Sequence, residues 1–193
     1  NSSSVIDNLS PNNMKTIEHP RFLLCLSITL LSLSSIAVAE PLLSWQPKVQ
    51  INGIGDVRIG MTVSEAAQAA RIRLVSVGTI DRHCYYVRPQ KNSQHISVMV
   101  VEGRIARIDI NPGSSIKTLS GAGIGDSEQQ IESLYRDRLK VSPHKYLRGH
   151  YLTFTPTGQT DRNYRLIFET DGRRVVNYRV GKMPEVAYVE GCS

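Results

Sequence analysis

The stretch of this 193-residue chain that most resembles a reactive centre is Asp81-Arg82-His83-Cys84. A thiolate beside an imidazole and a carboxylate can act as a nucleophile that a neighbouring base activates. Neighbouring residues of a strand, however, point to opposite faces of a sheet, so His83 is poorly placed to take a proton from Cys84. We therefore predict no catalytic residue here, and we keep an enzyme that uses Cys84 as the alternative.

The cysteines favour a disulfide. Of Cys25, Cys84 and Cys192, the first lies in an N-terminal apolar run that we expect to be removed. Two cysteines in an exported chain most simply form one bridge, Cys84–Cys192. Because Cys192 is the penultimate residue, the bridge would attach the C-terminal tail to the body of the protein. If both cysteines were found as free thiols, Cys84 would again be a candidate nucleophile.

Metal and cofactor chemistry finds little support in the residue spacings. The histidines beyond the N-terminal run are His83, His95, His144 and His150, and none has a short, ligand-like spacing to another histidine or to a carboxylate. The tetrapeptide Gly-Ile-Gly-Asp occurs twice, but neither copy has the glycine spacing and the following helix of a dinucleotide loop. We predict no metal and no cofactor.

The N-terminus has the pattern of an export signal. Residues 1–13 are polar and precede the first methionine, so we interpret them as an expression scar or an upstream extension of the reading frame. From Met14, basic residues lead into the apolar run Phe22–Val38 and the small-x-small site Ala37–Ala39. A run of about 17 residues, interrupted by Ser, is short for a membrane anchor. We predict a signal peptide over 14–39, no stable membrane span after its removal, and a secreted or periplasmic protein.

The charge balance is basic but diffuse. Lys and Arg number 23 against 17 Asp and Glu, a formal net charge of +6, without a run of five like charges. A solvated surface and an anionic partner are both compatible with this pattern. Nucleic acid is not expected as a partner in an exported protein, and the sequence indicates no oligomeric state.

Two helix starts predict an internal repeat. Thr62 with Glu65, and Ser127 with Gln130, have the spacing of capping boxes. Apolar residues with helical spacing follow each of them, which predicts one helix from residue 63 and another over 127–139. The helix starts, each two residues after a glycine, are separated by 127 − 62 = 65 residues.

Matching strands follow each predicted helix. Glu102-Gly103 and Asp171-Gly172 each lie between two strand-like runs and are typical of hairpin turns. We therefore predict an α+β fold of two tandem repeats, 40–112 and 113–193, each a short capped helix packed on an antiparallel sheet. Because neither repeat has enough apolar residues to fold easily alone, we expect one continuous sheet with both helices on one side.

The stretch IGMTVSEAAQAA (residues 59–70) resembles the helix-opening signature of the repeats in the β-lactamase inhibitory protein. It is also similar to that of the small outer-membrane assembly lipoproteins. Both resemblances imply a helix packed on a three- or four-stranded sheet, and the first implies inhibitor-like protein binding. The tandem arrangement favours the resemblance to the inhibitory protein. The lack of a usable lipobox cysteine departs from the lipoprotein pattern.

Strand alternation predicts a sheet with two unlike faces. Within residues 104–110, Ala106, Ile108 and Ile110 share one face while Arg107 and Asp109 share the other. The apolar face would cover the helices, and the polar face would stay exposed. Arg and Tyr are enriched at protein interfaces, so this face is a candidate binding surface for a protein or an anionic envelope component. The alternative is a solvated face on a structural envelope protein without a specific ligand. The candidate binding residues are Tyr86, Arg88, Arg107, Tyr151 and Arg179.

Overall fold

A computed structural model of the protein describes residues 47–78, 81–91 and 95–192. These residues form one compact unit. The residues predicted to form the scar or extension and the signal peptide lie outside the described ranges. Within those ranges the fold is α+β, with two α-helices and two antiparallel sheets of three and eight strands, which confirms the predicted fold class at that level.

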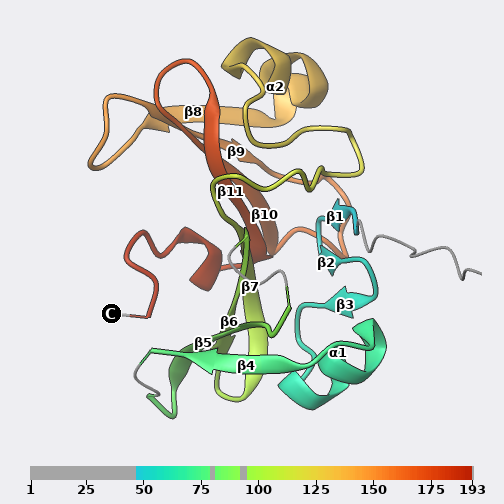
Figure 1. Cartoon of the computed structure of the whole chain (residues 1–193). Helices are drawn as coiled ribbons and strands as arrows, with labels where there is room; N and C mark the ends of the chain where they lie inside the picture. The colour runs from blue at the N-terminus through green and yellow to red at the C-terminus, as the bar shows by residue number, and fades with distance from the viewer. Residues whose placement is uncertain (1–46, 79–80, 92–94, 193) are drawn as a thin grey trace, which may run out of the picture. The chain divides into compact units, whose positions relative to one another are not determined.

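The large sheet has the strand order β4-β5-β6-β7-β11-β10-β9-β8, and every neighbouring pair is antiparallel (Figure 1). Its centre is the pair β7–β11, where Ile108 lies opposite Val180. The strands are β4 (Leu74–Val77), β5 (Cys84–Pro89), β6 (Ile96–Val101), β7 (Arg104–Ile110), β8 (Leu139–Pro143), β9 (His150–Phe154), β10 (Tyr164–Thr170) and β11 (Val175–Lys182).

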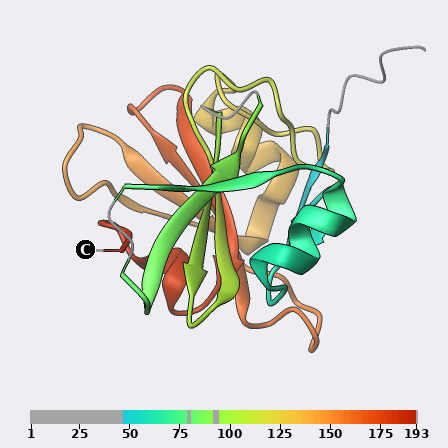
Figure 2. The same ribbon diagram turned by 60° about the horizontal axis from the view of Figure 1, so that its bottom comes forward.

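Both helices and the small sheet lie on one side of the large sheet, and the C-terminal segment lies on the other (Figures 1 and 2). The small sheet contains only two-residue strands. The remaining elements are β1 (Val49–Gln50), β2 (Gly53–Ile54), β3 (Val57–Arg58), α1 (Val63–Ala70), α2 (Glu128–Tyr135) and the 3₁₀ turns η2 (Arg136–Arg138) and η3 (Glu185–Ala187).

The two helices begin in a similar way. At α1, the Glu65 amide donates to the Thr62 hydroxyl at 3.2 Å, and the Thr62 amide donates to the Glu65 carboxylate at 2.7 Å. At α2, the Gln130 amide donates to the Ser127 hydroxyl at 3.2 Å. Each cap satisfies amides that a helix start leaves without intrahelical partners.

The second helix is shorter than the predicted 127–139. Arg136 has a φ of 45°, which takes the backbone out of the helical region, and a 3₁₀ turn follows. Leu139, which the apolar spacing placed on the helix, is the first residue of β8. Ile131 and Tyr135 are buried, whereas Leu134 is 38% exposed. Periodicity therefore located the helix but overestimated its length.

Matching contacts join each helix-preceding turn to a later hairpin. The Gly60 amide donates to the Ile105 carbonyl at 2.7 Å, and the Arg104 guanidinium donates to the Gly60 carbonyl at 2.8 Å. In the other half, the Gly125 amide donates to Val175 at 2.9 Å, and Arg174 donates to Gly125 at 2.6 Å. Both glycines have positive φ, 96° and 86°, a conformation that glycine adopts without strain.

The hydrophobic core lies between the helices and the sheet. The ring of Phe168 is completely buried, with centroids 5.6 Å from Tyr135 on α2 and 5.4 Å from Tyr178 on β11. The helix-facing residues of neighbouring strands continue this layer. They include Val87, Val98, Ile108, Val180, Leu166 and Leu152.

Candidate functional site

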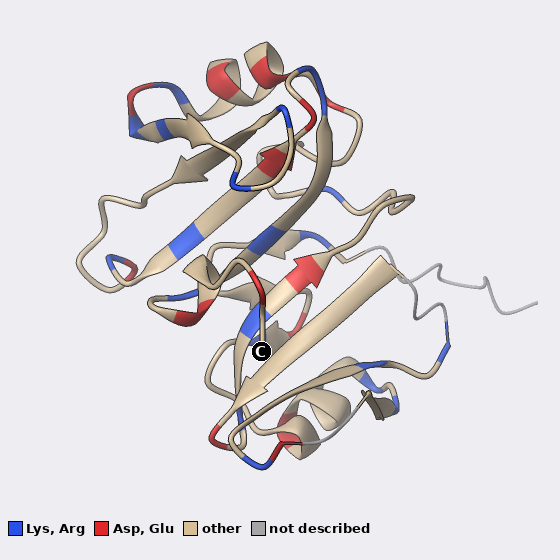
Figure 3. Ribbon diagram, turned by 90° about the vertical axis from the view of Figure 1, so that its left-hand side faces the viewer, with Lys and Arg blue, Asp and Glu red and all other residues tan. Residues whose placement is uncertain are grey.

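The polar face of the large sheet is covered at its centre. Residues 183–192, here called the tail, run across this face, and η3 contacts β7, β10 and β11 (Figure 3). Arg107 and Arg179 are each only 5% exposed. The expectation that the polar face of the sheet stays exposed is therefore wrong at these two arginines. Alternation correctly assigned them to one face but gave no information on which segment covers it.

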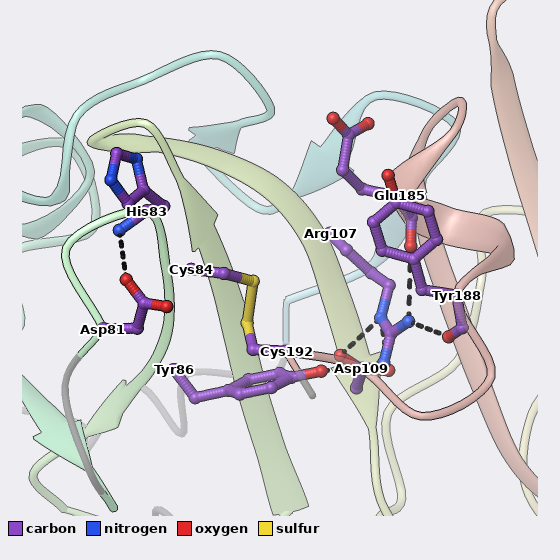
Figure 4. Close-up of a disulfide and its surroundings, with 9 residues drawn as sticks. All are labelled: Asp81, His83, Cys84, Tyr86, Arg107, Asp109, Glu185, Tyr188 and Cys192. Atoms are coloured by element: carbon purple, nitrogen blue, oxygen red, sulfur yellow. Dashed lines mark hydrogen bonds and ion pairs between the residues drawn. A yellow bond between two sulfur atoms is a disulfide. The ribbon is translucent and has the colours of Figure 1, made fainter.

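Arg107 uses its guanidinium entirely within the protein. Its Nε donates to Asp109 at 3.0 Å, and one Nη donates to the Tyr86 hydroxyl at 2.8 Å (Figure 4). The other Nη donates to tail carbonyls, to Tyr188 at 2.6 Å and to Glu185 at 3.3 Å. Buried charged groups require such partners, because losing water without replacement is costly. The tail supplies the required acceptors.

Arg179 contacts the tail in the same way. Its Nε donates to the Val186 carbonyl at 2.7 Å, and its Nη1 is paired with the Glu169 carboxylate. Its guanidinium also lies 5.8 Å from the ring centroid of Tyr151. Burial disfavours the ionised form of Glu169, but the charge and hydrogen bond of Arg179, with hydrogen bonds from Asn177 and His144, outweigh it and lower the pKa of Glu169.

Burial shifts the pKa of Asp109 and of Tyr86, both partners of Arg107, in the same direction. Burial raises the pKa of Asp109, and the nearby charges of Arg107 and Arg179 offset this only in part. Burial also raises the pKa of Tyr86 to about 12. The Tyr86 phenol is therefore neutral at ordinary pH and serves as a hydrogen-bond partner of Arg107.

The remaining predicted binding residues differ in their accessibility. Arg88 is exposed on β5. Tyr151 is half-buried and stacks on His144, with ring centroids 4.4 Å apart. Its hydroxyl is buried and has no hydrogen-bond partner within the described residues. Tyr86 contacts the tail as well, since a Cβ on Gly191 would lie 2.6 Å from the Tyr86 hydroxyl. The five candidates therefore do not form one exposed surface.

A disulfide joins Cys84 and Cys192, which confirms the predicted bridge (Figure 4). Its neighbour His83 is exposed and directs its Nδ1 to the Glu102 carboxylate at 2.8 Å. The hydrogen bond and charge of Glu102, with the charge of Asp81, raise the pKa of His83. The sulfur of Cys84 is thus bonded to Cys192, and the imidazole is turned toward a different partner.

The exposed apolar side chains of two segments define a different surface. Tyr146 and Leu147, in the loop between β8 and β9, are 59% and 52% exposed, and Tyr188 and Val189 in the tail are 43% and 37% exposed. We call these four residues the tail–loop patch. Glu190 connects the segments, because its Oε1 accepts from the Tyr146 hydroxyl and from Lys145 Nζ at 3.1 Å.

Sequence reasoning missed this patch because its residues belong to no periodic element. The available signal was local: Tyr146-Leu147 and Tyr188-Val189 are apolar pairs within polar, irregular segments. Such pairs have no internal face to occupy and are exposed unless another segment covers them. Their convergence depends on the disulfide and on the course of the tail, which alternation does not encode.

His144 determines the shape of the loop that carries Tyr146 and Leu147. Its Nδ1 accepts the amides of both residues, at 3.0 Å and 3.1 Å. A backbone amide can only donate, so the ring proton of the neutral imidazole lies on Nε2, 3.4 Å from the Glu169 carboxylate. The side chain of His144 is 5% exposed. The buried charges under the tail are thereby linked to the patch.

A cleft of about 590 Å³ opens beside the patch. Its lining includes Asp81, Lys145, Tyr188 and both bridged cysteines. The disulfide is therefore reachable from solvent through this cleft.

Among residues 47–78, 81–91 and 95–192, no group of three or more His, Cys, Asp or Glu side chains is arranged to hold a metal ion. No helix in the same ranges has the length and apolar character needed to cross a membrane.

Comparisons of the chain with protein-family models, with curated proteins and with solved structures found no match.

Proposed function

We propose that this protein is an exported, non-enzymatic binding module that contacts another protein of the cell envelope through the tail–loop patch. The observation that carries the proposal is the exposure of four large apolar side chains on two segments that Glu190 and the disulfide hold together. Exposed apolar clusters with a polar rim are typical of protein interaction sites, and Tyr is enriched among residues that dominate binding energy.

A protein partner has more support than an anionic envelope component. The two arginines at the centre of the sheet face, Arg107 and Arg179, donate to tail carbonyls and to internal carboxylates. They are therefore not free to bind an anion. The patch itself presents rings and aliphatic side chains, beside a Lys145–Glu190 pair whose charges offset each other.

The proposed architecture is a tandem repeat, 40–112 and 113–193, resembling the β-lactamase inhibitory protein. Two observations support it. The matching contacts of Gly60 with Arg104 and of Gly125 with Arg174 recur in the two halves. In addition, the strands of the large sheet run from β4 to β7 and then in reverse order from β11 to β8. This order is expected for two similar four-stranded units that pair through their last strands, β7 and β11.

Export through a signal peptide at 14–39 remains part of the proposal, to a periplasmic or secreted location. The Cys84–Cys192 bridge supports it, because disulfides persist mainly in oxidising compartments. The alternatives are an enzyme that uses Cys84 and a structural envelope protein without a ligand. Counting thiols in unreduced, denatured protein addresses the first: two free thiols would favour the enzyme.

The test is capture of envelope proteins on the immobilised mature protein, with quantification of the same captured band across variants. Tyr146→Ala and Tyr188→Ala should each weaken its binding by more than about 1 kcal/mol, roughly a fivefold loss of affinity. Tyr146→Phe keeps the ring and should bind more tightly than Tyr146→Ala. Leu119→Ala is the matched control, since Leu119 is apolar, 69% exposed and outside the patch.

Three outcomes would count against the proposal. Equal capture by all variants would show that the patch is not the contact surface. Loss of capture on Arg88→Ala alone would instead return the site to the exposed part of the sheet face. Capture that disappears merely on raising the salt concentration would indicate screened surface charge and no specific interface.

A further inference from the structure

The tail is held to the protein by two different sets of forces. Its first part, residues 183–188, is embedded: Val186 is completely buried against Gly181, and Arg107 and Arg179 donate to three of its carbonyls. The Met183 amide also donates to the Asn163 carbonyl at 2.8 Å. These contacts are independent of the disulfide.

The second part, residues 189–192, has few such contacts. Within the described residues, no backbone hydrogen bond is found for this stretch. Its polar side-chain contacts are those of Glu190 with Tyr146 and Lys145, and the side chains of the Lys145–Glu190 pair are 56% and 55% exposed. Exposed ion pairs contribute little to the position of a segment. Besides the contact of Gly191 with Tyr86, the disulfide is therefore the main attachment of residues 189–192.

The boundary between the two parts of the tail runs through the tail–loop patch. Val189 and the bridging Glu190 belong to the weakly held part, whereas the Tyr188 carbonyl is held by Arg107. Without Glu190 in place, the loop carrying Tyr146 and Leu147 loses the hydrogen bonds that Tyr146 and Lys145 donate to the tail. The disulfide thus determines whether the two halves of the patch form one surface.

The bridge is also open to chemistry. Both Cys84 and Cys192 are partly exposed and line the cleft of about 590 Å³. A small dithiol can enter this cleft. Its thiolate attacks one cysteine sulfur, which breaks the S–S bond, releases the other cysteine as a thiolate and forms a mixed disulfide. Its second thiol then displaces the attacked cysteine from the mixed disulfide. The bridge gains two electrons and two protons to give two thiols, and the dithiol is oxidised to its own disulfide.

We propose that the Cys84–Cys192 disulfide is a redox control on the patch: reduction by a dithiol releases residues 189–192 and abolishes partner binding, while residues 183–188 stay on the sheet. This inference rests on the proposed function of the patch. The release of residues 189–192 on reduction can be tested separately, because it is measurable without any partner.

The structural measurement is backbone ¹⁵N relaxation of the mature protein, oxidised and after dithiothreitol. On reduction, the order parameters of residues 189–192 should fall below about 0.6, while those near Val186 stay near the rigid-backbone value of about 0.85. Order retained throughout residues 189–192 would overturn the inference and leave the proposed function intact. Equal loosening of residues 183–188 would also overturn it, because the two-part attachment would be wrong.

The binding measurement uses the captured protein identified with the oxidised form. Reduction should lower capture to the level of the Tyr146→Ala/Tyr188→Ala double variant, and reoxidation should restore it. Unchanged capture with a released tail would overturn the inference. Failure of the oxidised protein to capture any partner would instead refute the proposed function, and with it the control of binding, whatever the relaxation data show.

A second variant guards against a simple loss of folding. Cys84→Ser/Cys192→Ser mimics the reduced state without a reductant, and its circular dichroism spectrum reports whether the sheet remains folded. An unfolded variant would overturn the inference, because the bridge would then be needed by the sheet itself and not only by residues 189–192. As a further variant, Cys84→Ser with the chain ended after Tyr188 removes the weakly held part directly. This shortened protein should keep its sheet and lose at least fivefold in partner affinity. Retained affinity in a folded, shortened protein would contradict the inference.

Discussion

The two faces of the large sheet are buried by different means. Toward the helices, apolar side chains such as Phe168 and Ile108 exclude water by close packing. Toward the tail, Arg107 and Arg179 are buried with carboxylates and with the carbonyls of an irregular segment. Apolar packing is non-directional, whereas a buried guanidinium needs acceptors at defined positions. The tail-facing side of the sheet therefore specifies where the tail lies. The helix-facing side specifies only that apolar residues cover it.

The largest effect is expected on the helix-facing side. Phe168→Ala removes a completely buried ring between Tyr135 and Tyr178, so we expect the free energy of unfolding to fall by about 3–5 kcal/mol. Urea unfolding followed by circular dichroism measures the change. Leu119→Ala, at an exposed apolar position, should change it by less than about 0.5 kcal/mol. Similar values for both variants would mean that the helix-facing layer is not the main core.

A somewhat smaller effect is expected on the tail-facing side. Arg179→Met leaves Glu169 without its cation and the Val186 carbonyl without its donor, so unfolding should become easier by about 3 kcal/mol. In the double variant Arg179→Met/Glu169→Met no charge is left unpaired, and part of the loss should return. If the double variant is less stable than either single variant, the Arg179–Glu169 pair itself stabilises the tail-facing side. The proposed difference between directional and non-directional burial would then lose its support.

The two carboxylates of the tail-facing side should titrate in opposite senses. The pKa of Glu169 is lowered below 4.5, so its contribution to stability is complete above that pH and is lost as the pH falls through the folded pKa. The pKa of Asp109 is raised above 3.8, so its contribution is present at low pH and is lost as the pH rises through the folded pKa.

The measurement is the unfolding free energy of the wild type, Glu169→Gln and Asp109→Asn between pH 3 and pH 7. The advantage of the wild type over Glu169→Gln should shrink in acid. The stability of Asp109→Asn relative to the wild type should increase with rising pH. The effect is smaller than that of Arg179→Met, since protonation removes a charge but keeps the hydrogen-bonding group. If the stability differences of Glu169→Gln and Asp109→Asn from the wild type change in the same direction with pH, the pKa values of Glu169 and Asp109 are not shifted in opposite directions.

The smallest effect is expected at the helix starts. Thr62→Ala removes the hydroxyl that accepts the Glu65 amide, and such caps contribute about 1 kcal/mol. Thr62→Ser, which keeps the hydroxyl, is the matched control. Thermal unfolding of the three proteins measures the difference. A loss as large as that of Phe168→Ala would imply that helix formation, and not packing, limits the stability of this face.

Sequence patterns predicted what depends on neighbouring residues. Alternation assigned Arg107 and Asp109 to the face opposite Ile108, and two cysteines in a chain predicted for export indicated one bridge. The cover over Arg107 could not be predicted, because the tail has no periodicity and reaches the sheet only through tertiary contacts. The tail–loop patch was missed for the same reason: Tyr146 and Tyr188 are 42 residues apart in the sequence, and their segments are joined through Glu190, which accepts a hydrogen bond from Tyr146.

The position of Gly181 has a consequence for the order of folding. A Cβ there would lie 2.7 Å from the Ala106 carbonyl and 3.0 Å from Val186, so the docking place of the tail is complete only when β11 lies beside β7. The two arginines that receive the tail come from these two strands, one from each half of the chain. We therefore expect residues 183–188 to dock late in folding, after β7 and β11 have paired. During oxidative refolding, pulsed amide hydrogen exchange should show protection of the paired β7 and β11 amides before quenching of free thiols detects the Cys84–Cys192 bond, and the reverse order would refute this sequence of events.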